Sequence, residues 1–273
     1  LAFDEQRPVF ELWKSQREAL PHALGTNPGA VVSLKTSGGK TRVAELAILQ
    51  TLTEQPESKI LFLAPFRSLA FEMEQTLART FRPLGYEISH LYGGARASRS
   101  DVELTEEAHI IVATPEKARA IFRGAPTLFS EIKLIIIDEG HLLDSDPRNV
   151  RNEMYFEHLR VRARLSETRI LLLSAALPNA AQIAQWIAGD PNNLGSSQWR
   201  PSLQRSGLLR WDGSRVRLEW RGDYRSFNPH FVVAKPTSQR KNAKKLPSNR
   251  KAAIAATAMR LYSDARPVMI FAA

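Results

Sequence analysis

A glycine-rich loop with a lysine and a threonine lies near the N-terminus, in the run Lys35-Thr36-Ser37-Gly38-Gly39-Lys40-Thr41. Glycines let backbone N–H groups surround an anion, because no Cβ stands in the way. A helix that begins near Lys40 adds the positive end of its dipole. In such a loop the lysine reaches the β- and γ-phosphates and the threonine hydroxyl binds Mg²⁺. The run therefore predicts a nucleotide site; the alternative is a glycine turn before a surface helix with an exposed lysine.

A pair of acids follows roughly a hundred residues later, where the apolar run 134–137 leads directly into Asp138 and Glu139. Phosphoryl transfer depends mainly on positioning and charge. We expect Asp138 to hold Mg²⁺ opposite Thr41, and Glu139 to orient and activate the attacking water. An acid pair of this kind is, by itself, more often a strand end that meets solvent. Together with the loop, and in this order, it predicts a site of nucleotide hydrolysis.

The elements that must position these residues alternate between two patterns. Continuous apolar runs are typical of strands buried on both faces, and helical periodicity separates them. Such alternation predicts an α/β fold with a mainly parallel sheet covered on both sides. We expect strands at 31–34, 59–64, 88–92, 110–113, 134–137 and 170–173, and helices near 10–24, 40–49, 69–77 and 152–165.

The last third of the chain has a different character. The segments 208–211 and 216–220 flank Asp212-Gly213, a strong signal for a two-residue hairpin. The stretch from Lys235 to Lys251 is basic and weakly apolar, and we expect a linker or mobile loop there. A helix around 252–262 leads to Pro267–Phe271, which resembles the first strand of a further domain.

Composition limits the classes of function. The 273 residues carry a net charge of +10 and 43% hydrophobic residues, which indicates a globular protein with a polyanionic partner, nucleic acid before membrane. No apolar run is long enough to span a bilayer, and the N-terminus does not resemble a signal peptide. The absence of cysteine excludes disulfides and thiolate metal sites and fits a reducing compartment. We expect a cytoplasmic location, or a nuclear one in a eukaryote.

Several segments resemble the motifs of superfamily 2 helicases of the DEAD/DEAH type, in family order. The loop 35–41, Asp138-Glu139-Gly140-His141 and Ser174-Ala175-Ala176 resemble motifs I, II and III. The segment 64–70 resembles motif Ia. Gly93-Gly94 and 114–117 resemble further nucleic-acid-contacting motifs. The loop variant, the Asp-Glu-x-His box and the segment around Trp211 are most similar to the superkiller/Brr-type (Ski-like) branch. Leu34 stands where the family usually carries alanine, and Ala176 where threonine is commoner.

The resemblance implies roles for residues around an ATP and Mg²⁺ site. Gln16 would read the adenine edge, and His141 and Ser174 would couple the site to the rest of the motor. Arg67, Gly93, Gly94 and Thr114, with Arg96 as a further candidate, would contact the phosphates of a single DNA or RNA strand. Thr114-Pro115 also suits a helix N-cap and first turn, a natural phosphate site. Each assignment has a plainer alternative. Gln16 would be an exposed helical glutamine, His141 a histidine with a structural role, and the proposed phosphate contacts helix caps and surface charges.

The resemblance also implies an architecture and an activity. Residues 1–195 would form the first RecA-like ATP-binding domain of a P-loop NTPase, 196–250 a hairpin and basic linker, and 251–273 the start of a second RecA-like domain. The activity would be that of an ATP-dependent helicase or translocase. A remodeller or clamp that does not separate strands, and a P-loop kinase, are the alternatives. Because the second domain would supply arginines to the γ-phosphate, we expect residues 1–273 alone to hydrolyse ATP slowly and to unwind nothing.

Overall fold

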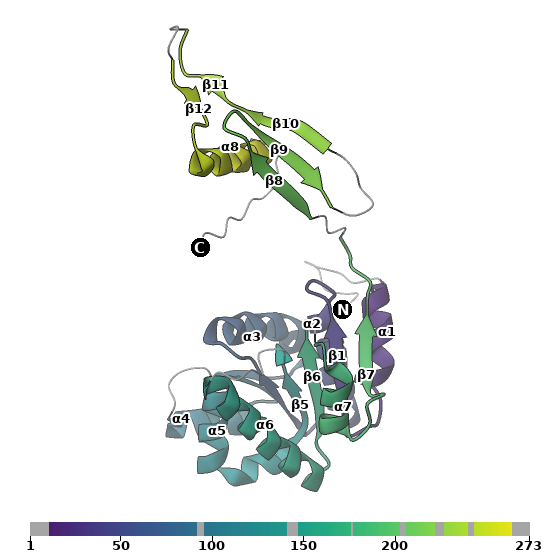
Figure 1. Ribbon diagram of the computed structural model, residues 1–273. Helices are drawn as coiled ribbons and strands as arrows, with labels where there is room; N and C mark the ends of the chain where they lie inside the picture. The colour runs from purple at the N-terminus through teal and green to yellow at the C-terminus, as the bar shows by residue number, and fades with distance from the viewer. Residues whose placement is uncertain are drawn as a thin grey trace. The chain divides into compact units, whose positions relative to one another are not determined.

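The computed structural model describes residues 11–91, 96–140, 147–175, 177–202, 206–221, 227–239 and 243–263 (Figure 1). The chain divides into two compact units, Leu1–Pro201 and Ser202–Ala273. Within the described residues, none of the helices is both long and apolar enough to cross a membrane.

The first unit is built on a seven-stranded sheet in which every pairing is parallel. This confirms the predicted α/β class and parallel sheet. Strand β7 was not predicted, because its Leu-Gly-Ser-Ser sequence has no apolar run. The strand order is β3-β4-β2-β5-β6-β1-β7, with bounds β1 Gly29–Leu34, β2 Lys59–Leu63, β3 Ile88–Leu91, β4 Ile110–Ala113, β5 Ile132–Ile137, β6 Arg169–Ser174 and β7 Leu194–Ser197.

Helices cover both faces of this sheet, and alternate residues of one strand face opposite layers. On β5, for example, Leu134 and Ile136 belong to one buried cluster, whereas Ile135 and Ile137 belong to the other. The first cluster includes residues of α1 (Lys14–Ala23), α2 (Lys40–Glu54) and α3 (Arg67–Phe81). The second includes residues of α5 (Pro115–Gly124), α6 (Pro147–Leu165) and α7 (Ala180–Ala188). The short elements are α4 (Arg99–Glu107), η1 (Arg82–Leu84) and η2 (Pro126–Glu131).

The second unit contains a three-stranded antiparallel sheet of β8 (Gly207–Trp211), β9 (Arg215–Trp220) and β10 (Phe227–Val233). The predicted hairpin at Asp212-Gly213 is confirmed: β8 pairs with β9, and Gly213 has a φ of 95°. Helix α8 (Arg250–Ser263) packs against β9 and β10. Strand β10 was not predicted.

The predicted linker or mobile loop at 235–251 is partly wrong. It contains a two-stranded antiparallel ribbon, β11 (Lys235–Pro236) with β12 (Lys245–Leu246). Strands this short carry no sequence pattern of their own, so that only their pairing identifies them. The predicted strand 267–271 lies outside the described residues, and the predicted domain identities stay predictions.

Candidate nucleotide and nucleic-acid site

The predicted site residues gather at one edge of the parallel sheet. Because all seven strands run in the same direction, the loops that follow them emerge at a common edge. The strand order places the ends of β1, β6 and β5 next to each other, followed by those of β2 and β4. Ligands of open α/β sheets bind at this edge. Along it lie the loop 35–39 after β1, Ser174 at the end of β6, Asp138 and Glu139 after β5, Arg67 after β2 and Thr114 after β4.

The loop after β1 has the conformation that its glycines permit. Gly39 precedes α2 with a left-handed φ of 84°, and Ser37 has a φ of 64°. The N–H of Gly38 donates to the carbonyl of Lys35 at 2.8 Å, and a Cβ on Gly38 would lie equally close to that oxygen. Helix α2 has no side-chain cap among the described residues. The N–H groups of its first turn, where Lys40 and Thr41 lie, are therefore suited to bind an anion.

The loop lysine and the second acid form an ion pair across this edge. Lys40 Nζ lies 3.1 Å from Glu139 Oε2, and the two side chains are 14% and 26% exposed. Glu139 has a left-handed φ of 53°, which is uncommon for a residue with a side chain. Its N–H donates to Asp138 Oδ1 at 2.8 Å, while the Asp138 N–H donates to the carbonyl of Leu63 at 2.9 Å. The structure thus brings together the two parts of the predicted nucleotide site.

The donor atoms at this edge fit magnesium held together with a nucleotide. Mg²⁺ is commonly bound by one or two carboxylates, water and substrate phosphates rather than by an all-protein cage. Asp138 offers a carboxylate and Thr41 a hydroxyl. Among the described residues no three His, Cys, Asp or Glu side chains form a metal-binding group. The remaining ligands would therefore come from the phosphates and from water.

Helix α1 contacts the glycine loop directly. Ser15 Oγ donates to the carbonyl of Gly38 at 2.8 Å, and Gln16 Nε2 donates to the carbonyl of Gly39 at 3.2 Å. Gln16 Oε1 accepts from the Trp13 N–H at 2.8 Å. A Cβ on Gly39 would lie 2.1 Å from Gln16 Nε2, so the approach requires glycine. The predicted adenine contact of Gln16 stays a prediction. Ser15, fully buried, was not singled out from the sequence.

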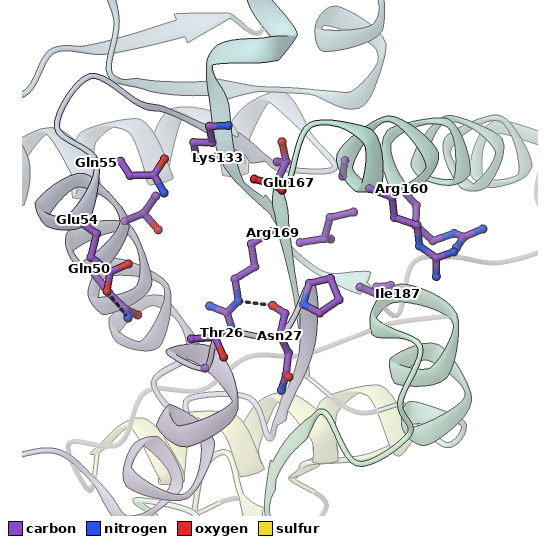
Figure 2. A pocket seen from close by; sticks show the side chains of 17 residues that line it. Thr26, Asn27, Gln50, Glu54, Gln55, Lys133, Arg160, Glu167, Arg169 and Ile187 are labelled. Atoms are coloured by element: carbon purple, nitrogen blue, oxygen red, sulfur yellow. Dashed lines mark hydrogen bonds between the residues drawn. The ribbon is translucent and has the colours of Figure 1, made fainter.

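The other end of α1 is held by Arg169, the first residue of β6. Its guanidinium donates to the carbonyls of Asn27 at 3.0 Å and His22 at 2.6 Å, and also to that of Ala23. Figure 2 shows the side chain extending towards Asn27. Burial lowers the pKa of the guanidinium, although arginine stays charged. The bonds to His22 and Ala23 satisfy the carbonyls of the last two residues of α1.

The hollow in Figure 2, of about 460 Å³, lies at the opposite edge of the sheet from the glycine loop. Its lining comes from the loop before β1, the first residues of β5 and β6 with the turn before β6, and the C-terminal parts of α2, α6 and α7. It is therefore separate from the candidate nucleotide site.

The predicted nucleic-acid residues occupy the adjoining part of the carboxyl edge. Arg67 is the exposed first residue of α3, and Thr114 is the buried N-cap residue of α5, with Pro115 in the first turn. The side chain of Thr114 makes no capping bond. Arg96 is exposed. Ser174, fully buried, is aligned with Ser33 of β1. Gly93, Gly94 and His141 lie outside the described residues.

A buried ion pair that was not predicted connects α4 with α5 beside this edge. Lys117 Nζ donates to Asp101 Oδ2 at 2.6 Å and to the carbonyl of Arg96 at 2.9 Å. Asp101 also accepts from the Ser98 N–H at 2.6 Å, which completes a capping box. Burial raises the pKa of Asp101, but the bonds from Lys117 and Ser98 outweigh it, so that the pKa lies below its ordinary value. Lys117 thereby fixes the backbone of Arg96.

The comparisons with known proteins agree on one family. Residues 13–183 match the DEAD/DEAH box helicase family. Hachiman protein HamB of Bacillus cereus is 39% identical over 275 residues, which cover 98% of this chain and 24% of HamB. The ATP-dependent DNA helicase Hel308 of Thermococcus kodakarensis is 29% identical over 221 residues, covering 78% of this chain and 18% of Hel308.

A solved structure supports the fold. The DUF1998 helicase MrfA, in its DNA-bound crystal structure, is similar with a TM-score of 0.59 and 20% identity, over 72% of this chain and 28% of that chain. This likeness concerns the fold and confirms the predicted RecA-like type. The chain spans about a quarter or less of the length of the two curated relatives.

Proposed function

Because the chain belongs to the DEAD/DEAH box helicase family, we propose that it is part of an ATP-dependent motor that moves along, or unwinds, nucleic acid. The observation that carries the proposal is the ion pair of Lys40 with Glu139 at the mouth of the glycine loop. It joins a phosphate-binding cation and a general base within one site. A small-molecule kinase would explain this pair, but not the family match over residues 13–183.

The geometry supports a division of roles between Lys40 and Glu139. Lys40 exchanges its bond to Glu139 for the β- and γ-phosphates of ATP, because phosphate is a strong acceptor for an ammonium group. The Glu139 carboxylate then orients a water molecule and accepts its proton. Magnesium, held by Thr41 and Asp138, would supply positive charge to the phosphates. Gln16 beside the loop is the candidate adenine contact.

We infer that the nucleic-acid strand crosses the neighbouring part of the same edge. Arg67 supplies an exposed charge, and the first turn of α5 behind Thr114 supplies backbone N–H groups. Arg96, Gly93 and Gly94 complete the proposed contact set. Contacts of this kind go to phosphates and therefore read little base sequence. A second RecA-like domain, proposed to begin near residue 251, would complete the motor in the whole polypeptide.

The test separates nucleotide binding from turnover with two variants of the full-length protein. Lys40→Ala should weaken ATP binding about 10- to 100-fold, because it removes charge-assisted bonds of roughly 1.5–3 kcal/mol. Glu139→Gln should bind ATP about as tightly as wild type but turn it over about 10²–10⁴-fold more slowly, because it lacks the base. Calorimetry and phosphate release measure the two quantities.

Lys133→Ala is the matched control, since this lysine is the second residue of β5, at the opposite edge of the sheet. It should leave ATP binding and turnover unchanged. Equal ATP affinity in wild type and Lys40→Ala would contradict the nucleotide assignment. A strand-displacement assay then separates unwinding from translocation without strand separation.

A further inference from the structure

Helices α5 and α6, side by side on one face of the sheet (Figure 1), border a hollow of about 710 Å³ together with η2. Its walls carry a cluster of positive charge. Among the described residues that line it, none is acidic. The lining includes four arginines, Arg119 and Arg123 of α5 and Arg151 and Arg162 of α6. This basic groove lies on the face of the sheet that α5, α6 and α7 cover, and it contains none of the candidate nucleotide residues.

The charges of the basic groove are not neutralised within the part of the chain that the structure describes. Arg119, Arg123 and Arg151 have no carboxylate partner among these residues, whereas Arg160 on the same helix pairs with Glu157 at 2.5 Å. Arg162 stacks over the ring of Phe129 at 4.2 Å, and this contact fixes its direction. Like charges held close together repel each other, and an anionic partner would relieve that repulsion.

The floor of the basic groove is apolar and contains an unsatisfied polar atom. Phe122, Phe129 and Leu159 line it and are almost fully buried. The hydroxyl of Tyr155 is buried and has no hydrogen-bond partner among the described residues. Burial raises the pKa of Tyr155, and the nearby positive charges of Arg119 and Arg162 oppose this effect. Buried hydroxyls usually have a partner.

An apolar stripe continues from the basic groove along the outer face of α6. Met154 lines the groove and is 70% exposed, and Leu165 at the end of the helix is 83% exposed. Val150 and Val161 lie between 40% and 50% exposed on the same helical face, since the four residues are spaced by 4, 7 and 4 positions. The stripe is about 22 Å long. Exposed His158 lies between Met154 and Val161 on this face, so the stripe consists of two apolar pairs, Val150 with Met154 and Val161 with Leu165. Apolar residues grouped on one helical face mark interaction sites more often than scattered single residues do.

We propose that the basic groove and the apolar stripe of α6 form a docking surface for an acidic amphipathic helix of a separate protein. Such a helix would cover the stripe with its apolar face and place carboxylates against the arginines, which bind carboxylates in a bidentate manner. A nucleic-acid strand would neutralise the arginines but would leave Val150, Val161 and Leu165 exposed. Charge and apolar surface together therefore favour a protein partner.

The test uses the full-length protein and a synthetic fluorescein-labelled 18-residue helical peptide, with leucines along one face and glutamates on both flanks. Fluorescence anisotropy should report saturable binding, and a scrambled peptide of the same composition should bind at least about tenfold more weakly, a difference of 1.4 kcal/mol. Arg119→Glu/Arg123→Glu and Met154→Asp should each weaken peptide binding about tenfold or more. Circular dichroism checks that both variants remain folded.

The matched control is Arg79→Glu/Arg82→Glu, which makes the same change in net charge at the end of α3 and in η1, on the opposite face of the sheet. Its peptide affinity should equal that of wild type. An equal loss in both double variants would mean that net charge alone attracts the peptide. Absence of binding, or equal binding of the scrambled peptide, would also overturn the proposal.

Two further outcomes distinguish other occupants of this surface. If an 18-nucleotide oligothymidine displaces the peptide and loses affinity in Arg119→Glu/Arg123→Glu but not in the control, the groove is a nucleic-acid site and the proposal is wrong. A cysteine introduced by Leu165→Cys should react rapidly with a maleimide in the native full-length protein, as peptide mapping would show. Protection of that thiol would mean that the polypeptide itself covers the stripe.

Discussion

Glu139 combines a strained backbone with a side chain that points towards Lys40. Its φ of 53° belongs to the left-handed region, which residues with a Cβ rarely occupy and which costs of order 1–3 kcal/mol. Gly140 follows, and a Cβ there would lie 2.4 Å from the side chain of Leu172. The glycine therefore lets the chain pass closely over β6 just after the acid. Such strain at the end of a strand is typical of sites where a side chain must point towards a ligand.

The Asp101–Lys117 pair gives a pH-dependent prediction beside the proposed nucleic-acid edge. The folded pKa of Asp101 lies below its ordinary value, so its charged form stabilises the fold above about pH 4 and this contribution disappears as the pH falls through the folded pKa. Asp101→Asn should lower the free energy of unfolding at pH 7 by about 1–3 kcal/mol. The difference from wild type should shrink below pH 4.

Urea unfolding at pH 7 and pH 3.5 measures this difference. Asp190→Asn, a change of the same kind in the loop before β7, is the control. A destabilisation by Asp101→Asn that is equally large at both pH values would show that the carboxylate charge is not its source.

Individual residues were predictable where a local pattern carries the chemistry. Lys40, Asp138 and Glu139 follow from their neighbours in sequence. Lys40 and Glu139 form an ion pair in the structure, and their roles stay predictions. The contacts of Lys117 with Asp101 and of Arg169 with α1 were missed for the opposite reason. Their partners lie 16 and more than 140 residues away in the sequence, and a local pattern does not predict a contact that only the tertiary fold creates.

At the scale of elements, α1 is held at both ends. Ser15 and Gln16 near its first turn bond to the glycine loop, and Arg169 bonds to its last carbonyls. Strand β7 also approaches α1 closely, because a Cβ on Gly195 of β7 would lie 2.8 Å from Ala19 Cα. Helix α1 is thus positioned by β6 and β7 while its first turn supports the glycine loop.

Arg169→Lys should loosen α1 selectively. Lysine carries one ammonium group in place of the planar guanidinium, so about two hydrogen bonds of roughly 1 kcal/mol each are lost. Hydrogen exchange followed by mass spectrometry should show about tenfold or greater acceleration in residues 14–24 and no change in α7. The conservative change Arg164→Lys on α6 is the control. Unchanged protection of α1 in Arg169→Lys would contradict the positioning role.

Most of the long elements were predicted, whereas the short helices α4 and α7 and the short polar strands were not. The strands of the parallel sheet other than β3 and β7 contain continuous apolar runs, which are typical of strands buried on both faces. Strands β7 and β11 have few apolar residues, and their pairing partners alone define them. The helix predicted at 152–165 begins earlier, at Pro147, because proline suits the first turn of a helix.

At the scale of the whole molecule, the carboxyl edge of one sheet would serve two ligands. The candidate nucleotide residues follow β1, β6 and β5, and the candidate nucleic-acid residues follow the adjoining β2 and β4. The net charge of +10 fits a polyanionic partner. The family match confirms the predicted resemblance to superfamily 2 helicases. DNA and RNA offer the same phosphate groups to the proposed contact residues. The motif residues and the fold therefore predict a nucleic acid without distinguishing the two.

The most direct test of the motor proposal is the steady-state ATP turnover of the full-length protein with and without a saturating single strand, using DNA and RNA in parallel. Our account predicts that at least one of them raises turnover severalfold, that the stimulation falls with increasing salt because the contacts are to phosphates, and that it depends little on base sequence. Glu139→Gln provides the background rate. An ATP turnover that neither DNA nor RNA changes, at low salt and saturating concentration, would contradict the proposal that this site drives a nucleic-acid motor.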